Sequence, residues 1–126
     1  MTGLAARRVL GAAGVLLALA TIAGALGAHT LKSQWAPQRL DVYDTAVRYQ
    51  FYQSLGLLGI GLALHWLDAA PLRVAALLVI AGIVLFCGSL YALTLGAPRL
   101  VGAVTPIGGL ALIAGWLLFS YGIWRG

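Results

Sequence analysis

Four long runs of mainly apolar residues constrain this chain more than any other feature of its sequence. A helix of about 20 apolar residues is long enough to cross the hydrocarbon core of a bilayer. Membrane-spanning strands are the alternative, but they alternate in polarity with a period of two, and the runs show no such alternation. The sequence therefore predicts an all-α, integral membrane four-helix transmembrane bundle. It forms a single domain with spans at about residues 9–28, 40–67, 72–96 and 105–124.

Composition supports a membrane rather than an aqueous environment. Hydrophobic residues make up 62% of the 126 residues and charged residues only 9%, whereas a soluble domain carries about 25% charged residues. Such a chain could not cover its own surface in water. Four helices and short loops use the whole length, which leaves no room for a separate soluble domain.

The net charge of +5 raises the question of nucleic acid as a partner. The basic residues are scattered singly between apolar runs, and no basic stripe with interleaved aromatic residues is present. Their positions suit helix ends that meet lipid headgroups. We therefore predict the lipid bilayer as a partner and exclude nucleic acid.

The first apolar run follows Arg7 and Arg8 and could be a secretory signal, with the small residues Ala25 and Gly27 near a cleavage point. It is longer than the apolar core of about 7 to 15 residues that is typical of a signal. We therefore expect a retained helix. The single cysteine, Cys87, excludes an intrachain disulfide and a multi-cysteine metal site, and we predict no metal or other cofactor.

Prolines mark where three of the helices begin. Pro37 and Pro71 suit the first turn of a helix, where the missing backbone donor would be unpaired in any case. Thr105 is predicted to cap the last helix, with Pro106 at its first position. Residues 97–99 end the third helix.

An even number of spans places both termini on the same side of the membrane. The basic residues of the loops are nearly balanced between the two sides, but Arg7 and Arg8 before the first helix favour cytoplasmic termini. Aromatic residues are expected at the two membrane interfaces. Trp66, Tyr121 and Trp124 are predicted to form one belt, and Trp35 and Tyr43 the other.

Small residues recur every four positions on the predicted helices, and this spacing lets helix backbones approach closely in a membrane. The pattern predicts tight packing between the helices of one chain, with contacts in a homo-oligomer or a larger membrane complex as the alternative. The glycines predicted to lie at helix contacts are Gly24, Gly88, Gly96, Gly108, Gly109 and Gly115.

Polar residues at membrane depth concentrate in the second helix, and they are candidate functional residues because a charge within a bilayer is costly. Asp44 and Arg48 have the spacing of a favourable i,i+4 ion pair, which would position the helix in the interface. The alternative is a polar cavity that receives a headgroup, an ion or a small polar ligand. Tyr52 shares the face of this pair. Tyr49 and Gln53 lie beside it.

His29 is a further candidate, because the start of the second helix could bring Asp44 close to it. His29 lies on the side of the membrane where the second helix begins, whereas His65 lies near the other end of that helix. Arg48 and His65 alone are roughly 25 Å apart at about 1.5 Å per residue, so the two histidines cannot share a metal. Ser89 is expected to form a hydrogen bond between helices. We predict no catalytic residue.

A resemblance that covers nearly the whole chain is carried by four ordered segments: residues 24–29 (GALGAH), 45–52 (TAVRYQFY), 86–91 (FCGSLY) and 105–116, which begins TPIGG. Together they closely resemble the family of domain of unknown function 423, which contains YgdD-like bacterial inner-membrane proteins and animal transmembrane protein 256. The resemblance implies a four-span bacterial inner-membrane protein without an established activity. Gln53 stands where that family usually has histidine, so a titrating or metal-binding role would not carry over to this chain.

Three classes of function remain. We favour a non-enzymatic membrane protein that packs with itself or with a larger complex through its small-residue faces. The alternative is a minimal transporter, a channel, or a protein that binds lipid or a small ligand through the polar face of the second helix. A membrane enzyme built on His29, Asp44 and Arg48 is disfavoured, because the other three predicted helices offer no carboxylate.

Overall fold

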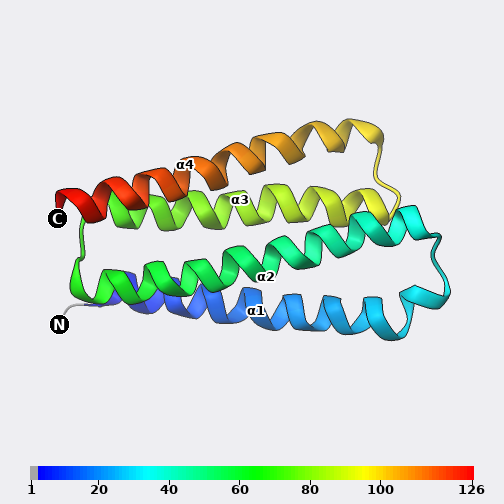
Figure 1. The fold of residues 1–126 in the computed structure, drawn as a ribbon, viewed down its shortest axis with the longest axis horizontal. Coiled ribbons are helices and arrows are strands. Elements are labelled where there is room, and N and C mark those ends of the chain that lie inside the picture. Colours follow the sequence, from blue (N-terminus) through cyan, green and yellow to red (C-terminus); the bar gives the residue numbers. More distant parts are fainter. Residues whose placement is uncertain (1–2) are drawn as a thin grey trace.

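The computed structural model describes residues 3–126, and four long helices make up most of them. These helices run up and down along one bundle, and both ends of the chain lie at the same end of it (Figure 1). Each helix begins before the predicted start of its span, and the first two helices do so by including polar residues such as Arg7 and Gln38. The helices are α1 (Leu4–His29), α2 (Pro37–Trp66), α3 (Ala70–Thr94) and α4 (Val104–Arg125). Two short 3-10 helices, η1 (Leu31–Ser33) and η2 (Arg99–Ala103), lie in the connections.

Backbone chemistry at the helix ends explains these bounds. Pro37 lies in the first turn of α2 and Pro71 in the first turn of α3, as predicted. Gly96 follows the end of α3 with a positive φ of 98°, which glycine adopts without steric cost. The N–H group of Ala97 then donates to the Ala92 carbonyl at 2.9 Å, and this bond closes α3 with a Schellman turn.

The predicted capping role of Thr105 is wrong. The last helix, α4, begins at Val104, and no side chain caps it. Because η2 leads directly into α4, Thr105 lies inside the first turn of the helix. Its hydroxyl forms a hydrogen bond with the Ser89 hydroxyl of α3 instead.

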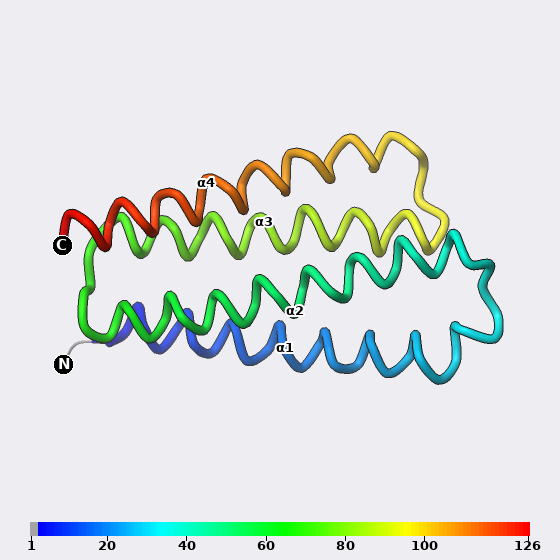
Figure 2. Tube along the Cα trace, in the orientation of Figure 1, coloured from blue at the N-terminus to red at the C-terminus, as the bar shows by residue number. Residues whose placement is uncertain are grey.

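Each helix packs mainly against its neighbours in the sequence, and Figure 2 shows the four helices lying side by side. One core of small and branched residues runs through the bundle. Its fully buried side chains include Ala13 of α1, Leu57 of α2 and Val79 of α3. Large apolar side chains such as Leu77 and Leu110 are exposed. An apolar exterior of this kind suits lipid rather than water.

The contact between α3 and α4 depends on glycine. Gly108, Gly115 and Gly122 recur every seven residues along α4, and all three face α3. A methyl group on Gly115 would lie 2.9 Å from the Val79 side chain, and one on Gly108 would overlap the backbone of Phe86. The two helices can approach this closely only where α4 has no side chain.

Two of the glycines predicted at helix contacts lie elsewhere. Gly88 has no atom of another helix within 4 Å of where a side chain would begin, and Gly96 forms the turn after α3. Four-residue spacing places small residues on one helix face, but it does not say which face meets a neighbour. Gly24 and Gly109 do make ordinary contacts, with Val47 of α2 and Phe86 of α3 respectively.

Three of the described helical segments are long and apolar enough to cross a membrane, and they are Leu4–Ser33, Ala70–Thr94 and Arg99–Arg125. The second helix, α2, is not among them, because charged and polar residues fill its first part. Most of the polar chemistry of the chain therefore lies on α2, between two strongly apolar helices.

Candidate functional site

A hydrogen-bonded glutamine lies inside the bundle. Gln50 of α2 is only 5% exposed, and its side-chain nitrogen donates to the Leu16 carbonyl of α1 at 2.8 Å. The Tyr91 hydroxyl of α3 donates to its side-chain oxygen at 2.7 Å. Polar groups in a membrane must find partners within the protein. Gln50 does so by joining three helices.

Other polar side chains also join neighbouring helices. The Tyr43 hydroxyl of α2 donates to the Ala23 carbonyl of α1. The side-chain Nε of Arg39 donates to the Thr94 carbonyl at the end of α3, at 2.8 Å, and its guanidinium lies 3.8 Å from the ring centroid of Trp35. Tyr43 is buried, and its ring lies edge-on to Trp35, the other residue of its predicted interfacial belt, with 5.5 Å between ring centroids. The depth of this pair in the membrane stays a prediction.

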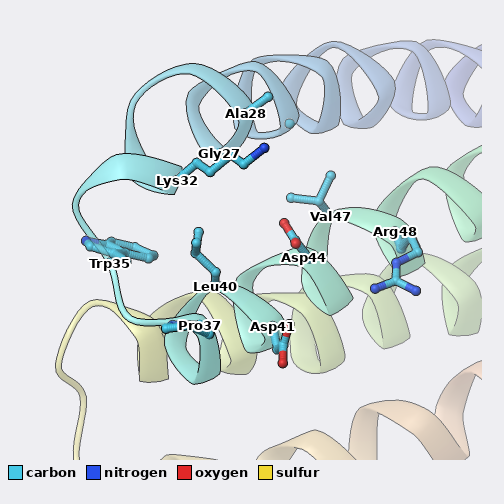
Figure 3. A pocket seen from close by; sticks show the side chains of 11 residues that line it. Gly27, Ala28, Lys32, Trp35, Pro37, Leu40, Asp41, Asp44, Val47 and Arg48 are labelled. Atoms are coloured by element: carbon cyan, nitrogen blue, oxygen red, sulfur yellow. The ribbon is translucent and has the colours of Figure 1, made fainter.

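A groove between α1 and the start of α2 gathers charged residues that these bonds do not use. We call it the interfacial groove (Figure 3). Its volume is about 670 Å³, within the range of about 300–1,000 Å³ for small-molecule sites. The lining residues are Gly24, Gly27, Ala28, Lys32, Trp35, Pro37, Leu40, Asp41, Asp44, Val47 and Arg48.

The charged groups of the interfacial groove are not paired with one another. Lys32 and Asp44 point into the space between α1 and α2, whereas Asp41 and Arg48 turn away from α1 (Figure 3). The predicted ion pair between Asp44 and Arg48 is wrong, since the only ion pair found within residues 3–126 lies in the turn between α2 and α3. Their spacing suits a pair, but the two side chains point in different directions. The groove is thus lined by two cations and two anions without an ion-pair partner, of which Lys32 and Asp44 point into it.

A second groove lies between α2 and α4, over α3, and we call it the lateral groove. Its volume is about 450 Å³. Tyr49 and Gln53 line it from α2, and Phe86 lines it from α3. The indole nitrogen of Trp116 donates to the Gln53 side-chain oxygen at 2.6 Å, and the Trp116 ring lies against Gly56. The other lining residues are Gly109, Leu112, Ile113 and Leu117.

The structure divides the predicted polar cluster between these two grooves. Asp44 and Arg48 line the interfacial groove, whereas Tyr49 and Gln53 line the lateral groove. Each residue of an α-helix is rotated by about 100° from the one before. Side chains that lie close along α2 therefore face different neighbouring helices.

Three other candidate residues lie outside both grooves. His29 is exposed at the end of α1, and Tyr52 is 57% exposed on α2. The Ser89 hydroxyl is bonded between α3 and α4. Within residues 3–126, no cluster of three or more His, Cys, Asp or Glu side chains could hold a metal ion.

Sequence reasoning missed Gln50, Lys32 and Trp116 as site residues. Gln50 lies on the buried stripe of α2 with Ala46, Ser54 and Leu57, so a large polar residue on a mainly apolar helix face was the available signal. Lys32 and Trp116 reach the polar residues of α2 from other elements. No pattern within α2 could have identified them.

The helices and grooves define the chain as a small α-helical membrane protein. The model of the family described as "Protein of unknown function (DUF423)" matches residues 23–109. The chain belongs to this family, as the sequence resemblance indicates. The matched region contains the interfacial groove, α2 and α3, and it ends in the first turns of α4.

Curated relatives in bacteria are membrane proteins. A UPF0382 membrane protein of Staphylococcus saprophyticus is 40% identical over 117 residues, which cover 93% of this chain and 95% of the relative. The UPF0382 membrane protein YwdK of Bacillus subtilis is 40% identical over 111 residues, covering 87% and 89%. The UPF0382 inner membrane protein YgdD of Escherichia coli is 35% identical over 102 residues, covering 81% and 78%. No solved structure matches the chain.

Proposed function

We propose that all four helices cross the membrane, including α2. Helices α1 and α3 run in the same direction (Figure 1), so α2 must return from the end of α1 to the start of α3. It has 30 residues, or about 45 Å at 1.5 Å per residue, which exceeds the hydrocarbon thickness of about 30 Å. Its charged first part can therefore lie among the headgroups while the rest of the helix crosses.

This topology predicts that both termini face the cytoplasm of a bacterial cell, on the side of Arg7 and Arg8. Alkaline phosphatase is active only outside the cytoplasm. Fused after Gly126 it should be inactive, whereas fused to a chain truncated after Ser33, in the α1–α2 connection, it should be active. Activity at both positions would contradict four spans. Activity only in the fusion after Gly126 would show that the orientation is the opposite of the one proposed.

We propose that the protein is a non-enzymatic membrane protein that binds a lipid headgroup in the interfacial groove. The four charged side chains that line this groove without ion-pair partners support the proposal. Gln50 and Tyr91, between the helices, are used differently, because they are hydrogen-bonded within the protein, although the buried Ser54 hydroxyl has no partner. The transporter alternative has less support, since these bonds occupy the polar interior.

The mixed charge of the interfacial groove favours a headgroup that carries both a phosphate and an amine. Lys32 and Arg48 suit the phosphate, and Asp41 and Asp44 suit the ammonium group. Arg48 lies one helical turn deeper than Asp44, and a long arginine side chain can reach back toward the headgroup level. A phosphatidylethanolamine-type lipid has this combination of charges.

Native mass spectrometry of the detergent-purified protein tests the headgroup proposal. The wild-type protein should retain added phosphatidylethanolamine more strongly than phosphatidylglycerol, which has a phosphate but no amine. Loss of one charged contact at Lys32→Ala or Asp44→Asn should weaken phosphatidylethanolamine binding by about tenfold. Asp44→Asn keeps the size of the side chain and removes only its charge.

Arg99→Ala is the matched control for the loss of a cation. Arg99 is exposed at the same end of the bundle, in the α3–α4 connection outside the interfacial groove, so its loss should leave lipid retention unchanged. An equal loss of lipid binding in Arg99→Ala would show that binding depends on general surface charge rather than on the interfacial groove.

Contact with a second copy or a larger complex stays a prediction, supported by the exposed small residues Gly14 and Ala18 of α1.

A further inference from the structure

The lateral groove carries hydrogen-bond donors that the headgroup proposal does not use. The Gln53 side-chain oxygen accepts a hydrogen bond from Trp116, which leaves the NH2 group of this amide free to donate. Within residues 3–126, no hydrogen bond is found from that group or from the hydroxyl of Tyr49, which is 41% exposed. Unpaired donors are costly in the hydrocarbon core, where water is absent. An occupant with acceptor oxygens would satisfy them.

Gln53 lies near the middle of the bilayer if the four helices cross as proposed above, and Tyr49 lies about one helical turn nearer the headgroups. Gln53 is close to the midpoint of α2. Gly24 meets Val47 and Gly61 meets Leu10, and this alignment places the middle of α1 level with Gln53. The ester carbonyls of phospholipids lie at the edge of the hydrocarbon core, about 15 Å from its centre. An acyl chain at the depth of Gln53 therefore offers no acceptor.

We propose that the lateral groove binds an apolar ring compound with carbonyl oxygens, of the isoprenoid quinone class. The Gln53 amide and the Tyr49 hydroxyl donate to a ring carbonyl, and Phe86 and Trp116 contact the ring through their own aromatic rings. A volume of about 450 Å³ accommodates a substituted quinone ring. The tail leaves the groove past Leu117, which is 67% exposed.

Quenching of Trp116 fluorescence measures this binding in phosphatidylcholine nanodiscs. In the parent variant, phenylalanine replaces the other three tryptophans (Trp35→Phe, Trp66→Phe and Trp124→Phe). Decylubiquinone is expected to quench Trp116 in a saturable way. Tyr49→Phe removes one donor, breaks no hydrogen bond within the protein and keeps the ring packed against Phe86, 5.0 Å away between centroids. It should weaken decylubiquinone binding about fivefold.

Tyr52→Phe is the matched control, because Tyr52 lies beside Tyr49 on α2 with 5.9 Å between ring centroids but outside the lateral groove. Its affinity for decylubiquinone should equal that of the parent. Decylbenzene has a ring and a tail but no carbonyl, and it should not compete. Quenching without saturation, unchanged affinity in Tyr49→Phe, or competition by decylbenzene would each overturn the proposal. So would a stable dimer whose formation excludes decylubiquinone.

Discussion

Gly108→Ala is expected to destabilise the bundle by about 1–3 kcal/mol, the usual cost of forcing extra atoms into a packed site. The added methyl group would overlap the backbone of Phe86 in α3. A side chain can rotate away from a clash, but a helix backbone can move only by shifting the whole helix. Unfolding in mixed micelles of a mild detergent and sodium dodecyl sulfate, followed by circular dichroism, measures the change in free energy.

Gly88→Ala is the matched control, since it makes the same change on α3 where nothing lies within 4 Å. Alanine is preferred over glycine within a helix by about 1 kcal/mol, so this variant should be as stable as the wild type or more stable. Equal destabilisation by both substitutions would show that glycine is required for a reason other than contact between α3 and α4. An unchanged free energy of unfolding in Gly108→Ala would mean that α3 and α4 can move apart at little cost in stability.

Much of the fold follows from the apolar runs, because a bilayer requires helices of a certain length. The prolines in the first turns of α2 and α3 also mark helix starts correctly. Gly108, Gly109 and Gly115 were predicted at helix contacts and do meet α3, whereas Gly88 and Gly96 do not meet a neighbouring helix. Small-residue spacing alone could not say which of these glycines meets which neighbour. The contact depends on how each helix is rotated about its axis, which small-residue spacing does not specify.

The candidate site was predicted only in part, for a related reason. Asp44 and Arg48 have ion-pair spacing, but a spacing rule describes an isolated helix and ignores the neighbouring helix. In the structure α1 and η1 provide the opposite wall, and Lys32 faces Asp44 across the interfacial groove. Likewise, Gln53 bonds to Trp116, which is 63 residues away in the sequence. Partners at such distances are set by the fold rather than by local pattern.

Gln50→Leu is expected to destabilise the bundle by about 1–3 kcal/mol, because it removes two hydrogen bonds and leaves a polar partner unsatisfied. The substitution removes the donor to the Leu16 carbonyl and the acceptor for the Tyr91 hydroxyl. The Leu16 carbonyl still has its helical backbone partner, whereas the Tyr91 hydroxyl has none. Gln38→Leu, on the exposed first turn of α2, should change stability by no more than about 0.5 kcal/mol.

A double-mutant cycle separates the Gln50–Tyr91 bond from the packing of the two side chains. Tyr91→Phe alone leaves the Gln50 side-chain oxygen without its donor, whereas the double variant leaves neither partner unsatisfied. The double variant should therefore lose less stability than the sum of the two single variants, by about 0.6–1.7 kcal/mol, the range measured for polar contacts between membrane helices. Strictly additive losses would mean that the two side chains stabilise the bundle independently. Gln50 would then hold α1 and α2 together, while α3 would be held by packing alone.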